Sequence, residues 1–100
     1  ALTSMAILLA THTDPAIRNA GRAVSLAERA AFLTDRQHPG VLDVLATAYA
    51  ANHQLDKAIS NAEEALKVLG EQGPAGMIRS IRRRLEDYRN RAAVLPIVTP

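Results

Sequence analysis

Apolar and polar positions follow a helical period in five stretches of this chain. In each stretch apolar side chains recur three and four residues apart, with polar residues between them. The pattern therefore predicts an all-α chain, with helices over residues 1–11, 15–33, 41–51, 55–69 and 75–91.

Proline and acidic residues mark several of the predicted helix boundaries. Asp14 followed by Pro15 is a start signal, because aspartate caps free amide groups and proline suits the first helical turn. Pro39 stops a helix that approaches it from upstream. Pro96 is expected to end the last helix, so residues 92–100 are expected to form an extended tail.

Small residues repeat between the second and the fourth predicted helix. Three alanines of the second predicted helix recur 35 residues later in the fourth. They are Ala23, Ala27 and Ala30, which correspond to Ala58, Ala62 and Ala65. Helices cross closely only where side chains are small. A fixed period of this size is typical of stacked helix pairs that bury a core by packing on their neighbours.

The first and last predicted helices differ in how much of their surface is apolar. Ile7 and Leu8 lie opposite the apolar stripe of the first helix, so this helix needs cover on both faces. We expect a preceding repeat or a second copy of the chain to supply that cover; the second copy would make the protein a homo-oligomer. The last helix has one apolar face, which includes Ile81 and Leu85, and one polar face, as in a helix that closes a stack.

Composition narrows the classes of function. The 100 residues carry a net charge of +2, which is too small to imply nucleic-acid binding by itself. The chain contains no cysteine, which excludes disulfides and thiolate metal ligands. Its longest apolar run, Met5 to Ala10, is too short to span a bilayer.

Residues 39–70 resemble the tetratricopeptide repeat. The resemblance is carried by Leu42 at the usual tryptophan site, followed by Leu45, Ala46, Tyr49, Ala58, Ala62 and Ala65. Two positions depart from the pattern, because His53 replaces the usual turn glycine and Gly70 stands near the usual closing proline.

This resemblance implies a right-handed superhelix of helix hairpins over residues 1–91. Residues 1–33 would form an irregular first repeat, 39–70 the regular repeat and 75–91 a capping helix. The chain is then expected to be the C-terminal end of a longer repeat array.

The resemblance also implies a non-catalytic scaffold that binds a peptide or a partner protein in a concave groove. The first helix of each hairpin lines such a groove, which would place Asp43, Thr47, Ala50 and Ala51 toward the partner. Asp43 would repel a carboxylate, which disfavours a site for a C-terminal carboxylate.

Arginines on the last predicted helix suggest a different binding surface. Arg79, Arg82 and Arg83 belong to a set of six, opposed on this helix only by Glu86 and Asp87. The set is either a solvated closing face or a surface for an acidic partner. Nucleic acid is the less favoured ligand, because no aromatic residue stands among the arginines to stack on bases.

No pattern in the chain predicts an enzyme, a cofactor or a metal site. The serines lack a nucleophile-elbow motif and a neighbouring histidine. His12, His38 and His53 fall at predicted loops or helix ends, where turn and capping roles are expected. The remaining alternatives are a protein-interaction module, a self-associating structural segment and a basic surface on the last helix.

Overall fold

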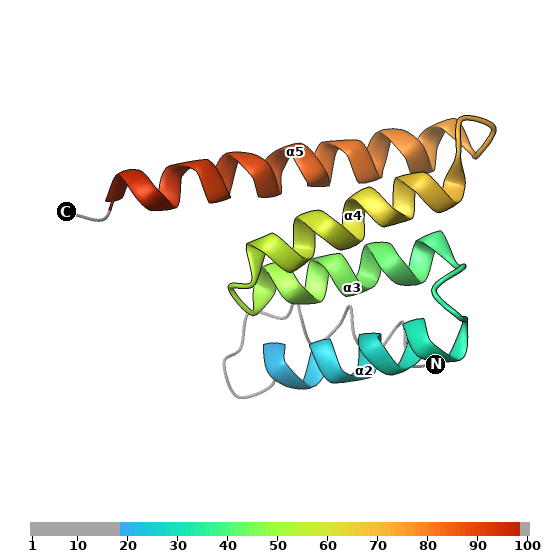
Figure 1. The fold of residues 1–100 in the computed structure, drawn as a ribbon, viewed down its shortest axis with the longest axis horizontal. Coiled ribbons are helices and arrows are strands. Elements are labelled where there is room, and N and C mark those ends of the chain that lie inside the picture. The colour runs from blue at the N-terminus through green and yellow to red at the C-terminus, as the bar shows by residue number, and fades with distance from the viewer. Residues whose placement is uncertain (1–18, 99–100) are drawn as a thin grey trace.

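Four helices stack in chain order in the computed structural model, which describes residues 19–98 and, for 95–98, the backbone alone. They are α2 (Ala20–Leu33), α3 (Pro39–Ala51), α4 (Leu55–Leu69) and α5 (Ala75–Val98). Each helix packs against the next one in antiparallel fashion (Figure 1). No strand occurs in residues 19–98, and the predicted all-α class is confirmed. The predicted helix over 1–11, with its homo-oligomer contact, lies outside the described residues, as do Asp14, Pro15 and His12.

The start of α2 differs from the prediction. The helix begins at Ala20 rather than near Pro15, because Asn19 is extended, with φ −113° and ψ 93°. The side-chain Oδ1 of Asn19 accepts a hydrogen bond of 2.9 Å from the backbone N–H of Arg22. Asparagine caps a helix as well as aspartate does, so Asn19 supplies the start signal that was assigned to Asp14.

The end of α5 also differs, since the helix continues to Val98. The predicted extended tail over 92–100 is therefore wrong for residues 92–98. Proline holds φ near the helical value, so Pro96 can follow the helical path although it has no N–H to donate to the carbonyl of residue 92. With 24 residues, α5 is the longest of the four helices.

The bounds of α4 agree with the prediction, whereas α3 begins at Pro39, two residues earlier than predicted, because proline suits the first helical turn. The turns that separate the helices use left-handed backbone. Gly70 ends α4 with φ +68°, and His53 adopts φ +61° between α3 and α4. His53 therefore occupies the conformation of the turn glycine that it replaces. His38 caps α3, where its Nδ1 accepts a hydrogen bond from the N–H of Val41 at 3.2 Å.

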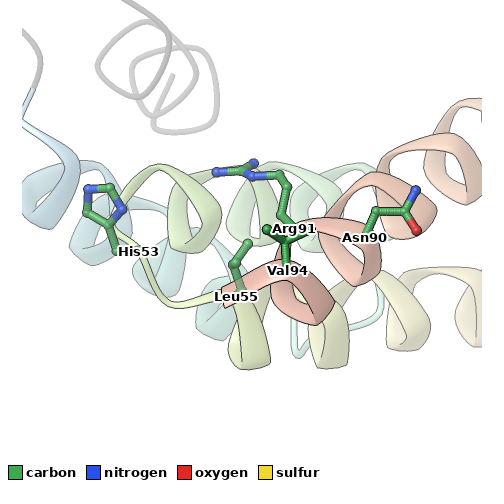
Figure 2. Close-up of a pocket in the computed structure, with 5 residues that line it drawn as sticks. All are labelled: His53, Leu55, Asn90, Arg91 and Val94. Carbon is green, nitrogen blue, oxygen red and sulfur yellow. The ribbon is translucent and has the colours of Figure 1, made fainter. Parts of the chain in front are cut away.

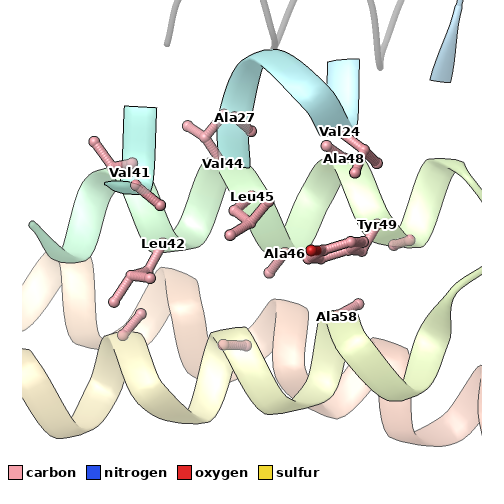
Figure 3. Packing of buried hydrophobic residues seen from close by; sticks show 14 of the residues in the cluster. Val24, Ala27, Val41, Leu42, Val44, Leu45, Ala46, Ala48, Tyr49 and Ala58 are labelled. Atoms are coloured by element: carbon pink, nitrogen blue, oxygen red, sulfur yellow. The ribbon is translucent and has the colours of Figure 1, made fainter. Parts of the chain in front are cut away.

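The repeated alanines lie inside the core. All six are buried, and Ala23, Ala27, Ala58, Ala62 and Ala65 have no exposed surface. The helix α3 lies between α2 and α4 and contributes residues to both contacts (Figure 3). Leu42, Leu45 and Ile81 are the largest fully buried side chains. Burial of one such side chain stabilises a fold by about 1.5–3 kcal/mol.

Polar side chains connect the α2–α3 turn to α4. The guanidinium of Arg36 donates two hydrogen bonds of 2.9 Å to the carboxylate of Glu64 and one of 2.6 Å to Oδ1 of Asn61. Asn61 is buried, and its side-chain amide donates to the carbonyl of Lys57 at 2.8 Å. Arg36 itself has φ +54°, so these bonds hold a left-handed turn residue in place.

Candidate functional site

The residues predicted to line a groove lie on the side of α3 that α5 reaches. Asp43 accepts hydrogen bonds from both Nε and Nη2 of Arg84, the first of 2.8 Å. The hydroxyl of Thr47 lies 3.4 Å from that of Tyr88 and donates to the carbonyl of Asp43 at 3.0 Å. The Asp43 side chain is only 19% exposed, so much of its surface is already covered.

The other two predicted groove residues offer little to a ligand. Ala50 is buried and Ala51 is half-buried. The four residues therefore share one face of α3, but two of them are engaged by long side chains of α5. As a partner-binding set they stay a prediction.

The contacts between α3 and α5 follow a regular spacing. Arg84 and Tyr88 meet residues 41 positions earlier in the chain, which means that the two helices run in the same direction. Burial raises the pKa of the Tyr88 hydroxyl, as expected for a side chain enclosed between helices. One helical turn further, the same spacing pairs Ala51 with Ala92. Both alanines are partly buried against the core, and neither carries a polar group that could continue the row of side-chain hydrogen bonds.

A pocket opens at this end of the helices. It has a volume of about 510 Å³ and is lined by His53, Leu55, Asn90, Arg91 and Val94, and we call it the end pocket. Figure 2 shows Leu55 and Val94 next to each other at its centre, with His53 and Asn90 at opposite sides. Leu55 is the buried floor, whereas Val94 is 54% exposed.

The end pocket combines an apolar centre with a polar rim. His53 and Arg91 supply nitrogen donors, and Asn90 supplies an amide. Arg91 also lies 3.7 Å from a carboxylate oxygen of Asp87, one helical turn earlier. An apolar side chain can enter such a site while its backbone bonds to the rim. The sequence prediction missed this pocket, because it depends on how far α5 extends past the α3–α4 turn.

The arginines of α5 divide into two groups. Arg84, Arg89 and Arg91 each pair with a carboxylate, on Asp43, Glu63 and Asp87 respectively. Arg79, Arg82 and Arg83 are exposed, and no ion pair links them to another described residue.

Helical spacing would allow Arg82 to pair with Glu86 and Arg83 with Asp87, but neither ion pair forms within residues 19–98. Glu63 of α4 pairs with Arg89 of α5.

The described part of the chain provides neither a metal site nor a membrane-spanning helix. Residues 19–98 contain no group of three or more acidic or histidine side chains placed to hold a metal ion. None of the helices in this range is both long enough and apolar enough to cross a bilayer.

Comparisons with protein-family models, with curated proteins and with solved structures find no match for this chain.

Proposed function

We propose that this chain is part of a tetratricopeptide-type helical array and serves as a non-catalytic protein-interaction module. Helix spacing supports the repeat assignment. The helices α2 and α4 begin at residues 20 and 55, and α3 and α5 begin at residues 39 and 75. Both intervals are close to the 34 residues of a tetratricopeptide repeat. The right-handed superhelix is the arrangement that we propose for the complete array.

The end pocket is the observation that carries the proposed function. Its volume of about 510 Å³ lies within the range of about 300–1,000 Å³ that is typical of ligand pockets. Leu55 and Val94 give it an apolar centre beside polar groups, which is the composition of a site that anchors one or two side chains of a partner.

The exposed part of Val94 indicates how a partner gains affinity. A leucine or isoleucine of the partner that covers Val94 and Leu55 loses its own contact with water, which is worth about 1.5–3 kcal/mol. Hydrogen bonds to Asn90 and His53 at the rim then set the orientation of the bound segment. We therefore assign partner binding to the end pocket, beyond the residues of α3 that α5 engages.

Selection of binders from a random peptide library tests this assignment. Peptides that bind the intact chain are expected to share an apolar anchor residue. Val94→Glu should weaken their binding by about tenfold or more, or about 1.4 kcal/mol, because a carboxylate would have to be buried in the apolar centre.

A matched control is Met77→Glu, which changes an exposed apolar residue near the other end of the same helix. It should leave binding within about twofold of wild type, a change well below the tenfold that corresponds to 1.4 kcal/mol. Equal losses in the two variants, or no enriched peptide, would contradict the proposed site. Circular dichroism of both variants confirms that the helices are retained.

A further inference from the structure

His53 adopts a backbone conformation that suits glycine better than histidine. Its φ of +61° lies in the left-handed region, where the Cβ atom of an L-residue is crowded by the following carbonyl group. Glycine has no Cβ and adopts this region without that cost. Residues with a side chain that are held in such a conformation are often found at ligand-binding sites.

Two other non-glycine residues of the described chain have positive φ, and both lie in the α2–α3 turn. They are Asp35 and Arg36, each with φ +54°. The guanidinium of Arg36 bonds to Glu64 and Asn61, which hold it in place. Aspartate has a short polar side chain and is one of the residues that tolerate left-handed backbone. Both conformations are therefore explained by the chain itself.

The imidazole of His53 has no comparable contact among residues 19–98. It is exposed, and it forms neither a hydrogen bond nor an ion pair with another residue in this range. The backbone N–H of His53 donates to the carbonyl of Ala50 at 3.2 Å, a bond that glycine would also make. No polar contact of this side chain within the described residues thus offsets its backbone conformation.

The same imidazole stands at the rim of the end pocket. Figure 2 shows the guanidinium of Arg91 extended toward the side of the pocket where His53 stands, with Asn90 on the opposite side. Arginine only donates hydrogen bonds, and a neutral imidazole has one donor nitrogen and one acceptor nitrogen. This side of the pocket is therefore complementary to an acceptor oxygen that lies next to a side chain bound over Leu55 and Val94.

We infer that the imidazole of His53 donates a hydrogen bond to an acceptor oxygen of the partner segment, beside the apolar anchor of that segment. The inference rests on the function proposed for the end pocket and names the contact that strengthens binding there. His53 then makes the α3–α4 turn less stable and the pocket tighter for its ligand, as expected where function and stability oppose each other at one residue.

Paired measurements of stability and binding test this inference. His53→Gly should raise Tm, because it relieves the left-handed backbone. It should also weaken the binding of peptides selected on the intact chain by about threefold to tenfold, the effect of one hydrogen bond. His53→Ala removes the imidazole and keeps Cβ, so it should lose as much binding without the gain in Tm. A role confined to the turn would not move stability and binding in opposite directions.

Asp35→Gly is the matched control for the backbone. Asp35 is exposed and left-handed like His53, but it does not line the end pocket. Glycine at this position should also raise Tm and should leave peptide binding within about twofold of wild type, well under a tenfold change. A general effect of turn flexibility or of higher stability would alter binding in both glycine variants.

Nitrogen-15 NMR of the histidine rings observes the contact directly. A saturating amount of selected peptide should shift the ring signals of His53. Those of His38, which caps the start of α3, should stay in place.

A second peptide selection, on His53→Gly, identifies the source of the oxygen. If peptides selected on wild type carry an oxygen-bearing side chain next to the anchor and those selected on the variant do not, the acceptor is a side chain. If binding is weakened in the variant but the flanking residues are the same in both selections, the acceptor is a backbone carbonyl. Both results support the contact.

Three results would overturn the inference. They are binding within about twofold of wild type in both His53→Gly and His53→Ala, an equal loss in Asp35→Gly, and unchanged ring signals of His53 at saturating peptide. If Val94→Glu still weakens the same peptides, the proposed function stands and only the role of His53 is lost. Peptides that tolerate Val94→Glu would contradict both the proposed function and the inference.

Discussion

Replacement of Ala62 by leucine probes the close packing of the helices. Ala62 lies in α4, has no exposed surface and belongs to the continuous core that α2, α3, α4 and α5 share. Leucine adds a branched side chain where the neighbouring helices leave room for one methyl group. Alanine and leucine have similar helix propensities, so the change tests packing rather than the stability of α4 by itself.

The expected loss of stability follows from the absence of exposed surface at Ala62. Extra carbon atoms in a well-packed core cost about 1–3 kcal/mol, because neighbouring side chains or the backbone must move. For a domain of this size, each kcal/mol corresponds to a shift of about 4–8 °C in Tm. Ala27→Leu, at the corresponding position of α2, should lower the free energy of unfolding by a similar amount.

Urea titration followed by circular dichroism measures this effect. The control is Ser60→Leu, an exposed position of α4, which should leave stability unchanged or slightly raised because leucine is the better helix former. The packing argument would be refuted if Ala62→Leu and Ala27→Leu stayed within about 0.5 kcal/mol of wild type, the range that is usual for surface substitutions.

Three further predictions concern the turns and the polar contacts. His53→Gly should raise the free energy of unfolding by about 0.5–1 kcal/mol in a thermal melt, since a left-handed residue with a Cβ costs about 1–2 kcal/mol; a lower Tm would contradict this. Glu64→Gln should cost about 0.5–1 kcal/mol in urea, a modest value because Arg36 and Glu64 are partly exposed. The hydrogen bond from Arg36 lowers the pKa of Glu64, so the stability that this ion pair contributes is present above the ordinary value of 4.5 and is lost as pH falls through the lowered pKa. If Glu64→Gln were still less stable than wild type in acid, that result would argue against the pair. Burial and a hydrogen bond to a carboxylate raise the pKa of Tyr49 to about 12, so its stabilising contribution is complete below pH 10 and is lost as pH approaches 12. Ultraviolet absorbance should then show little tyrosinate at pH 10, and full ionisation there would disprove the assignment.

The sequence was sufficient to predict the features that depend on local pattern. The bounds of α4, the end of α3 and the burial of the repeated alanines follow from helical periodicity and side-chain size. Asn19 was missed as the cap of α2, because Asp14 followed by Pro15 carries the same local signal a few residues earlier. The length of α5 was underestimated, because Pro96 has the local signature of a helix stop, whereas its fixed φ is itself compatible with a helix.

Features that join distant segments were beyond prediction from one sequence. The ion pairs of Arg84 and Arg89 connect different helices, with Asp43 on α3 and Glu63 on α4. Spacing within a helix gives no information about which carboxylate a neighbouring helix presents. The end pocket was also beyond prediction from the sequence. His53 and Val94 line it together only because α5 lies beside the α3–α4 turn.

Amide chemical-shift mapping with a selected peptide tests the proposed interaction module most directly. The peptide used is one whose binding is weakened by Val94→Glu. The largest shifts should fall on His53, Leu55, Asn90, Arg91 and Val94, with small changes along α2. Shifts centred on α2, or spread evenly over the helices, would contradict partner binding in the end pocket.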